Sequence, residues 1–294
     1  MSGIVTISSP ALSARISPLG AELVRLQDHD GLDLLWNGDP AFWTGRSPLL
    51  FPIVGEAMGN RIKVAGAQYE IARHGFARTS TFVLVSSDAA HCTWRLEANG
   101  ETRRQYPFNF RLDVTYRIEG AELHMAAEVT NRGDGPMPTS FGFHPALRWP
   151  LPYGQPREAH EIVFERDEPA PVRRPVDGLL SAARYPTPVR ARRLVLHDEL
   201  FEAGAIVFDT LASRSLVYGD LVRVSFPRMP HLGIWTKPGA GYVCIEPWQG
   251  HASPEGFDGE LADKPGMIAI APGTTQSFGM SIEVIGSPQR GDKR

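Results

Sequence analysis

Short runs in which apolar and polar side chains alternate recur along almost the whole chain, and this pattern restricts the fold more than any other feature of the sequence. Such alternation is typical of strands, because a helix would repeat every three to four residues. The alternating runs are 4–7, 14–16, 22–27, 81–85, 93–97, 112–118 and 123–129, and further strand-like runs follow at 205–208, 215–218, 222–226, 232–236, 242–245, 267–270 and 276–285. No segment longer than about ten residues shows sustained helical spacing. The sequence therefore predicts an all-β protein with few, short helices.

Turn-forming residues separate these runs. The chain contains 29 Gly and 25 Pro, which favours many turns and loops. The clearest hairpin has strands at 110–118 and 122–129 around a turn at Glu119-Gly120, and the segment 145–188 is expected to be mostly irregular. Because we find no internal repeat or linker, we expect one domain of antiparallel strands over residues 1–286 and a frayed polar tail at 287–294.

The composition points to a small, neutral partner. A formal net charge of −3 with 21% charged residues gives no reason to expect nucleic acid or an anionic membrane. The amino terminus lacks a basic region followed by a long apolar one, and no apolar run is long enough to cross a bilayer, so we expect a cytoplasmic protein. Cys92 and Cys244 each lie in a strand-like run, which favours buried free thiols over a disulfide or a metal site.

The segment 244–250, Cys-Ile-Glu-Pro-Trp-Gln-Gly, places an acid and an aromatic residue at the end of a hydrophobic run. Pro247 restricts the backbone of Glu246 to extended conformations, so the carboxylate has a fixed direction. The indole of Trp248 offers a flat apolar face and one N–H donor, which suits the C–H face of a sugar. The alternative is a glutamate at the end of a strand on a solvated turn.

Three other sites carry side chains suited to proton transfer or hydroxyl binding. His144 ends an aromatic run and precedes Pro145, which repeats the arrangement at Glu246. His74 precedes Gly75, which permits a sharp bend, and the turn at 59–62 presents Asn60 and Arg61. The alternatives are a structural histidine at 144 and solvated basic turns at the other two sites.

Five motifs occur in one order along nearly the whole chain: Phe-Pro-Ile-Val-Gly at 51–55, His-Gly-Phe-Ala-Arg at 74–78, Gly-Phe-His-Pro at 142–145, Phe-Asp at 208–209 and Ile-Glu-Pro-Trp at 245–248. Together they resemble the aldose 1-epimerase (galactose mutarotase) family, and within it the LacX-like branch. The resemblance implies a large antiparallel β-sandwich, called a supersandwich, whose concave face binds an aldose. It also implies an isomerase that needs neither a metal nor an organic cofactor.

The same resemblance implies roles for individual residues. Glu246 would take the proton of the anomeric hydroxyl, and His144, on the opposite side of C1, would protonate the ring oxygen. His74 would bind hydroxyls or share the work at the ring oxygen. The residues expected to bind substrate are Asn60, Arg61, Asp209 and Trp248. The sequence leaves open which aldose is used, whether it is phosphorylated, and the oligomeric state.

Two other functions remain as alternatives. A glycoside hydrolase would use Glu246 and Asp209 as a carboxylate pair around a glycosidic bond, although this does not account for His144 and His74. A carbohydrate-binding protein without activity would use Trp43, Trp248 and Arg61 to hold a sugar. A rate assay on a single anomer distinguishes the enzyme from the binding protein.

Overall fold

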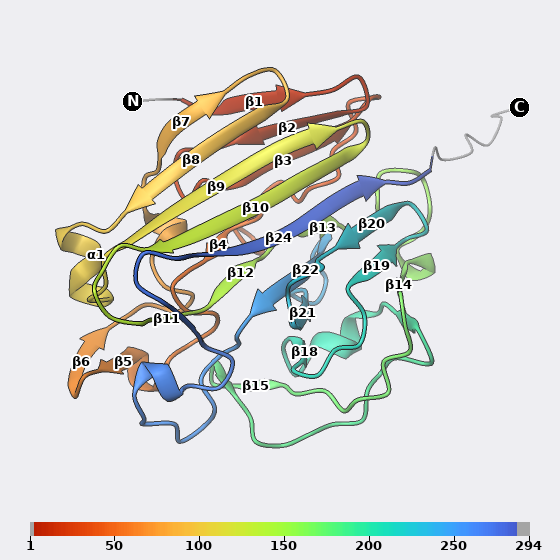
Figure 1. Cartoon of the computed structure of the whole chain (residues 1–294). Helices are drawn as coiled ribbons and strands as arrows, with labels where there is room; N and C mark the ends of the chain where they lie inside the picture. Colours follow the sequence, from red (N-terminus) through yellow and green to blue (C-terminus); the bar gives the residue numbers. More distant parts are fainter. Residues whose placement is uncertain (1–2, 287–294) are drawn as a thin grey trace, which may run out of the picture.

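A nine-stranded antiparallel sheet dominates the computed structural model, which describes residues 3–286 (Figure 1). Its strands, in spatial order, are β17 (Arg193–Val195), β14 (Glu161–Phe164), β19 (Ser215–Tyr218), β20 (Val222–Ser225), β24 (Thr275–Val284), β10 (Glu122–Asn131), β9 (Phe110–Glu119), β8 (His91–Glu97) and β7 (Val83–Ser87). The carboxyl-terminal β24 pairs with β10 on one side and β20 on the other. Strands from both halves of the chain thus share one sheet, which supports our proposal of one domain over residues 1–286.

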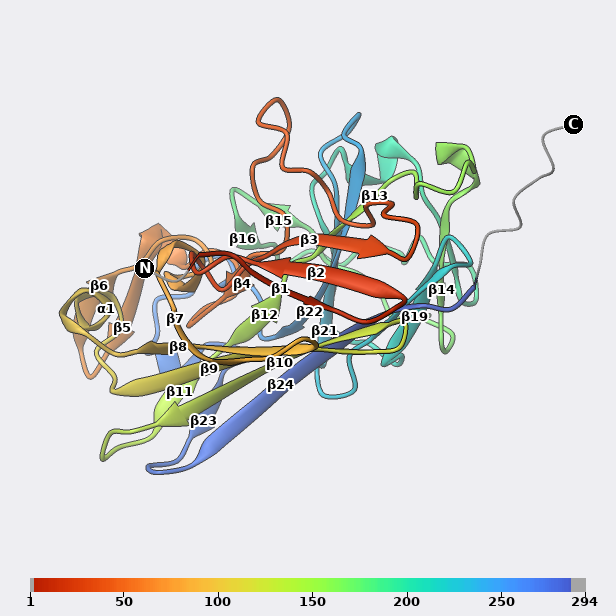
Figure 2. The same ribbon diagram turned by 90° about the horizontal axis from the view of Figure 1, so that it is seen from above.

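Two further sheets lie on one side of the nine-stranded sheet. The six-stranded sheet has the order β18 (Ile206–Phe208), β21 (His231–Trp235), β22 (Tyr242–Gln249), β12 (Phe141–Phe143) and β4 (Leu49–Leu50), with β13 (Ala146–Arg148) also paired to β22. The three-stranded sheet consists of β1 (Val5–Ser8), β2 (Leu12–Ile16) and β3 (Leu23–Asp28). Figure 2 shows β1–β3 as a layer over β8–β10.

Three two-stranded ribbons complete the β structure. They are β5 (Arg61–Val64) with β6 (Ala67–Glu70), β11 (Met137–Thr139) with β23 (Ile268–Ile270), and β15 (Pro175–Val176) with β16 (Leu179–Leu180). The described helices are α1 (Gly100–Gln105) and the 3-10 turns η1 (Met58–Asn60), η2 (Ala77–Thr79), η3 (Arg157–Ala159), η4 (Asp198–Phe201) and η5 (Leu261–Asp263). The predicted all-β fold with few, short helices is therefore confirmed. Among residues 3–286, no helix has the length and apolar character needed to cross a bilayer.

The alternation read from the sequence corresponds to burial of one strand face. In β10, Leu123, Met125, Ala127 and Val129 are buried, while the residues between them are partly or fully exposed. The predicted hairpin is present, with β9 and β10 in register around the turn at Gly120. The predicted tail at 287–294 lies outside the described residues.

The run predicted to end at Ile245 is longer than expected. Strand β22 continues to Gln249 and is buried up to Trp248, so Glu246 lies inside a strand and not at its end. Ile245 donates its N–H to Pro145 O, and the nitrogen of Pro247, two residues on, faces the same side. On that side β22 pairs with β12 at Trp248 and Gln249 and with β13 from Tyr242 to Cys244, so Pro247 falls between the two paired stretches.

Candidate active site

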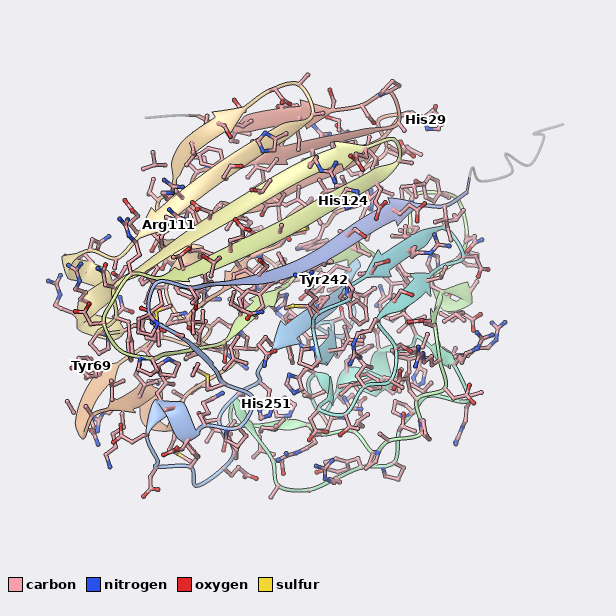
Figure 3. The ribbon with its side chains drawn as sticks, viewed as in Figure 1. His29, Tyr69, Arg111, His124, Tyr242 and His251 are labelled. Carbon is pink, nitrogen blue, oxygen red and sulfur yellow. The ribbon has the colours of Figure 1, made fainter. Side chains whose placement is uncertain are left out.

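A cavity of about 390 Å³ opens over the middle of β22, and its size is within the range for sites that bind small molecules. Strands β21 and β22, the turn at 73–78, the ribbon β15–β16 and the segment after β22 contribute its walls. The polar and aromatic residues that line it are Trp43, Arg73, His74, Arg78, His144, Trp235, Glu246, Trp248 and His251. Figure 3 shows Tyr242 at the start of β22 and His251 beyond its end.

His144 and Glu246 are in direct contact at the bottom of this cavity. The register of β22 is the same against β12 and β13, so His144, in the gap between them, lies opposite Glu246. Side chains of opposite residues in antiparallel strands project from the same face, and here His144 Nε2 is 3.1 Å from Glu246 Oε2. Both side chains are buried. The carboxyl and the imidazole are thus direct neighbours, whereas the resemblance led us to expect them on opposite sides of a bound C1.

Burial changes the proton affinity of both partners. Loss of solvent raises the pKa of Glu246 well above its usual range, an effect that the nearby Arg73 opposes. Loss of solvent also lowers the pKa of His144 to about 3. Both shifts favour the state without net charge, in which one proton is shared across the 3.1 Å contact.

His74 is held as a neutral hydrogen-bond donor. Its Nδ1 accepts the main-chain N–H of Gly55 at 3.0 Å, so the ring proton is on Nε2. Burial lowers the pKa of His74 well below its ordinary value. Its backbone has φ of 66°, and a Cβ at the following Gly75 would lie 2.2 Å from Phe51 O, so only glycine fits there. This turn places the His74 ring edge-to-face against that of His144, with centroids 5.9 Å apart.

Aromatic rings form the floor and one wall of the cavity. A Cβ at Gly142 or Gly233, on the two strands beside β22, would lie 2.6 Å or 2.3 Å from the indole of Trp248. The absence of side chains at both positions therefore allows this indole to lie along the sheet. Trp43 packs on His144 with a centroid distance of 4.9 Å and meets Trp235 edge-on. These rings provide the apolar surface that the C–H face of a sugar requires.

The structure places Asn60 and Arg61 outside this cavity. Both line a separate hollow beside the ribbon β5–β6, with Glu70 and Gln105. Arg61 is the first residue of β5, and its Nη1 lies 3.5 Å from Gln68 Oε1 on the partner strand. The turn identified in the sequence exists, but it directs these two side chains elsewhere.

Asp209 is also absent from the described lining of the cavity and has an indirect connection to it. Its carboxylate pairs with Arg173 at 3.4 Å and with Arg184 at 3.2 Å. These arginines flank the ribbon β15–β16, whose residues Pro175, Gly178 and Leu180 line the cavity. Asp209 therefore holds the ends of the ribbon β15–β16 through these two ion pairs.

Three residues that line the cavity had no role in the sequence-based site. Arg73 comes directly before the motif at 74–78 and Arg78 ends it, so proximity to His74 in the sequence could have pointed to both. Arg78 has no carboxylate within 4.0 Å among the described residues, and burial lowers its pKa. His251 donates from Nδ1 to Ala252 O at 2.9 Å, so its Nε2 is an acceptor, and burial lowers its pKa to about 4. No local sequence signal distinguished His251.

Lys264 supports the segment that carries His251. Its Nζ donates to His251 O, the residue is 3% exposed, and burial lowers its pKa to about 7. The unfolded chain binds this proton more tightly than the folded protein does. The free energy of unfolding should therefore rise as the pH increases from 7 toward the ordinary lysine pKa. The same contribution should be lost again as the pH falls to 7. We expect Lys264→Met to remove this dependence, which has a slope on the order of 1 kcal/mol per pH unit.

Urea unfolding of the parent and Lys264→Met proteins between pH 6 and 9 measures this slope. Lys63→Met is the matched control, because Lys63 is partly exposed and lies 3.9 Å from Glu260. Equal pH dependence in all three proteins would show that Lys264 keeps its ordinary pKa in the folded state.

Comparison with known proteins identifies the family of the chain. The model of the aldose 1-epimerase family matches residues 3–282. The chain belongs to the aldose 1-epimerase family. Among relatives of this chain, the plasmid-encoded protein LacX of Lactococcus lactis subsp. lactis is 30% identical over 297 aligned positions, covering 96% of this chain and 99% of LacX.

Solved structures of other epimerase-like proteins share the fold. A galactose mutarotase related enzyme from Lactobacillus acidophilus has a TM-score of 0.89 and 29% identity, with 97% of this chain and 98% of that one covered. A galactose mutarotase-like protein from Lactobacillus casei ATCC 334 has a TM-score of 0.87 and 24% identity, with 96% of this chain and 100% of that one covered. The recognised family and its LacX-like relatives are thereby confirmed.

Proposed function

We propose that this protein is an aldose 1-epimerase that interconverts the α and β anomers of a sugar bound over β22. The observation that carries the proposal is the contact of 3.1 Å between His144 Nε2 and Glu246 Oε2 in the cavity. Mutarotation requires removal of a proton from the anomeric hydroxyl and delivery of one to the ring oxygen. Both oxygens are bonded to C1, so two proton-transfer groups in contact can serve them together.

The pair can complete this exchange without a change in its total charge. One member takes the hydroxyl proton while the other protonates the ring oxygen, the C1 to ring-oxygen bond breaks, and the open-chain aldehyde forms. Rotation about the bond between C1 and C2 followed by the reverse transfer closes the other anomer. Constant charge suits a buried site, because an isolated ion there is costly. His74 would donate its Nε2–H to a substrate oxygen, and Trp248 would support the sugar's apolar face.

Polarimetry or NMR on a freshly dissolved single anomer tests this proposal. We expect the protein to accelerate the approach to anomeric equilibrium for at least one aldose in a panel of free and 6-phosphorylated sugars. Binding without acceleration for every member of the panel would instead favour a carbohydrate-binding protein. The glycoside hydrolase alternative lacks a second carboxylate, since Glu246 is the single acid among the described residues that line the cavity.

A phosphorylated or otherwise anionic aldose is the substrate class that the two arginines favour. Arg78 is partly buried at the cavity wall with no carboxylate within 4.0 Å in the described chain, although Glu22 acts on it from farther away, and an anionic sugar would supply a direct partner. We expect Arg78→Met to lower kcat/KM for a 6-phosphorylated aldose by roughly 10- to 100-fold, with a much smaller effect on the free aldose. Rates for the two sugars, measured with both proteins, give this comparison.

Arg61→Met is the matched control, because Arg61 lines the separate hollow. This variant should leave kcat/KM unchanged for both the free and the phosphorylated aldose. An equal loss for free and phosphorylated aldose in Arg78→Met would contradict recognition of an anion by Arg78.

A further inference from the structure

We propose that Cys244, Glu246 and His144 form a binding site for a single Zn²⁺ ion, and that zinc bound there blocks the active site. The inhibition rests on the proposed function, whereas binding of the metal does not. Cys244 is not among the residues that line the cavity, and the acid-base chemistry makes no use of its thiol.

Strand geometry brings the three ligands together. Cys244 and Glu246 are two residues apart on β22, so their side chains project from the same face. His144 lies opposite Glu246 across the interrupted strand pair. One ligand atom from each residue lies within 4.8 Å of the other two, and the contact between His144 and Glu246 is 3.1 Å.

These separations are close to what zinc requires. Zn²⁺ binds sulfur at about 2.3 Å and nitrogen or oxygen at about 2.0–2.2 Å, so in tetrahedral geometry two ligand atoms are roughly 3.3–3.7 Å apart. Side-chain shifts of about an ångström or less therefore suffice to close the site around the ion. Three protein ligands leave a fourth position, which faces the cavity and is free for water.

The charges of the ligands also match the ion. All three residues are buried, with Cys244 0%, Glu246 2% and His144 6% exposed. A thiolate and a carboxylate neutralise Zn²⁺, and neutral imidazole adds no charge, so the occupied site has no net charge. Zinc binding releases two protons to solvent, the thiol proton of Cys244 and the proton shared by His144 and Glu246, and no oxidant or reductant takes part.

Occupation of this site would stop proton transfer. The metal would take the lone pair of His144 Nε2 and a Glu246 oxygen, which are the two atoms that the sugar needs. Zinc should therefore inhibit competitively with the aldose, and a chelator should restore the metal-free rate.

Cobalt binding tests the site independently of activity. We expect the intact protein to bind one Co²⁺ per chain with a thiolate-to-cobalt absorption band in the near ultraviolet, and Zn²⁺ to displace it. Cys244→Ala should lose the band, and zinc should inhibit this variant on the order of 100-fold less tightly, judged against its own metal-free rate. Cys92→Ala is the matched control, because Cys92 is an equally buried free thiol on β8.

Several outcomes would overturn the proposal. Absence of the band in the intact protein would do so without any variant, even if Cys244→Ala failed to fold. Equal zinc inhibition of Cys244→Ala and Cys92→Ala would exclude Cys244 as a ligand. If the protein proves to lack mutarotase activity, the cobalt band still decides whether the metal site exists.

Discussion

Glu246→Gln is expected to lower the rate of anomer interconversion by on the order of 10²- to 10⁴-fold while the sugar still binds. Glutamine has nearly the same shape as glutamate but cannot take up or release a proton at neutral pH. It can still accept or donate a hydrogen bond across the 3.1 Å contact with His144, so the local packing should be preserved. Polarimetry on a single anomer measures the rate, and tryptophan fluorescence follows sugar binding beside Trp43, Trp235 and Trp248.

Unchanged thermal stability would confirm that the variant reports chemistry and not unfolding. A rate equal to that of the parent, at a sugar concentration that saturates both proteins, would exclude Glu246 from proton transfer. Loss of binding together with activity would show that its main role is to hold the substrate.

The second large effect should distinguish the two histidines. We expect His144→Asn to lower the rate on the order of 10²- to 10⁴-fold, because an amide cannot exchange a proton with Glu246 or the sugar. His74→Asn should cost less, because His74 acts only as a neutral donor and the asparagine amide retains an N–H. Asparagine also tolerates the positive φ of 66° found at this position.

Single-turnover rates of the two variants, measured with the same sugar and buffer, make the comparison direct. If His74→Asn loses most of the activity and His144→Asn little of it, the proton carrier is His74. The contact between His144 and Glu246 would then have a structural role.

Local patterns in the sequence were sufficient for the fold class and for the centre of the candidate site. Strand-like runs located most strands of the nine-stranded sheet, although not β14 and β17, and the X-Pro pairs at His144 and Glu246 marked two residues that the structure brings into contact. The contact itself depends on the register of β22 against β12 and β13, which no local pattern specifies.

The predictions that Arg61 and Asp209 line the cavity were wrong for related reasons. Arg61 belongs to a turn that the sequence located, but the direction of the ribbon β5–β6 depends on tertiary packing. Asp209 finds Arg173 and Arg184 as partners, and those residues are far from it in the chain. Pro247 led us to end the strand too early. The interruption that allows a proline at this position lies in the neighbouring strands, between β12 and β13, so the sequence around Pro247 does not reveal it.

The interruption between β12 and β13 also affects what happens when a sugar arrives. The two proposed proton-transfer groups lie opposite each other inside a sheet, Glu246 on β22 and His144 between β12 and β13, and each is followed by a proline that restricts its backbone. Their separation is therefore established when the chain folds, and no loop has to become ordered around the substrate to bring them together. The entropy of arranging the proposed acid and base is lost once, during folding, so each cycle of the proposed reaction would begin with the pair already aligned.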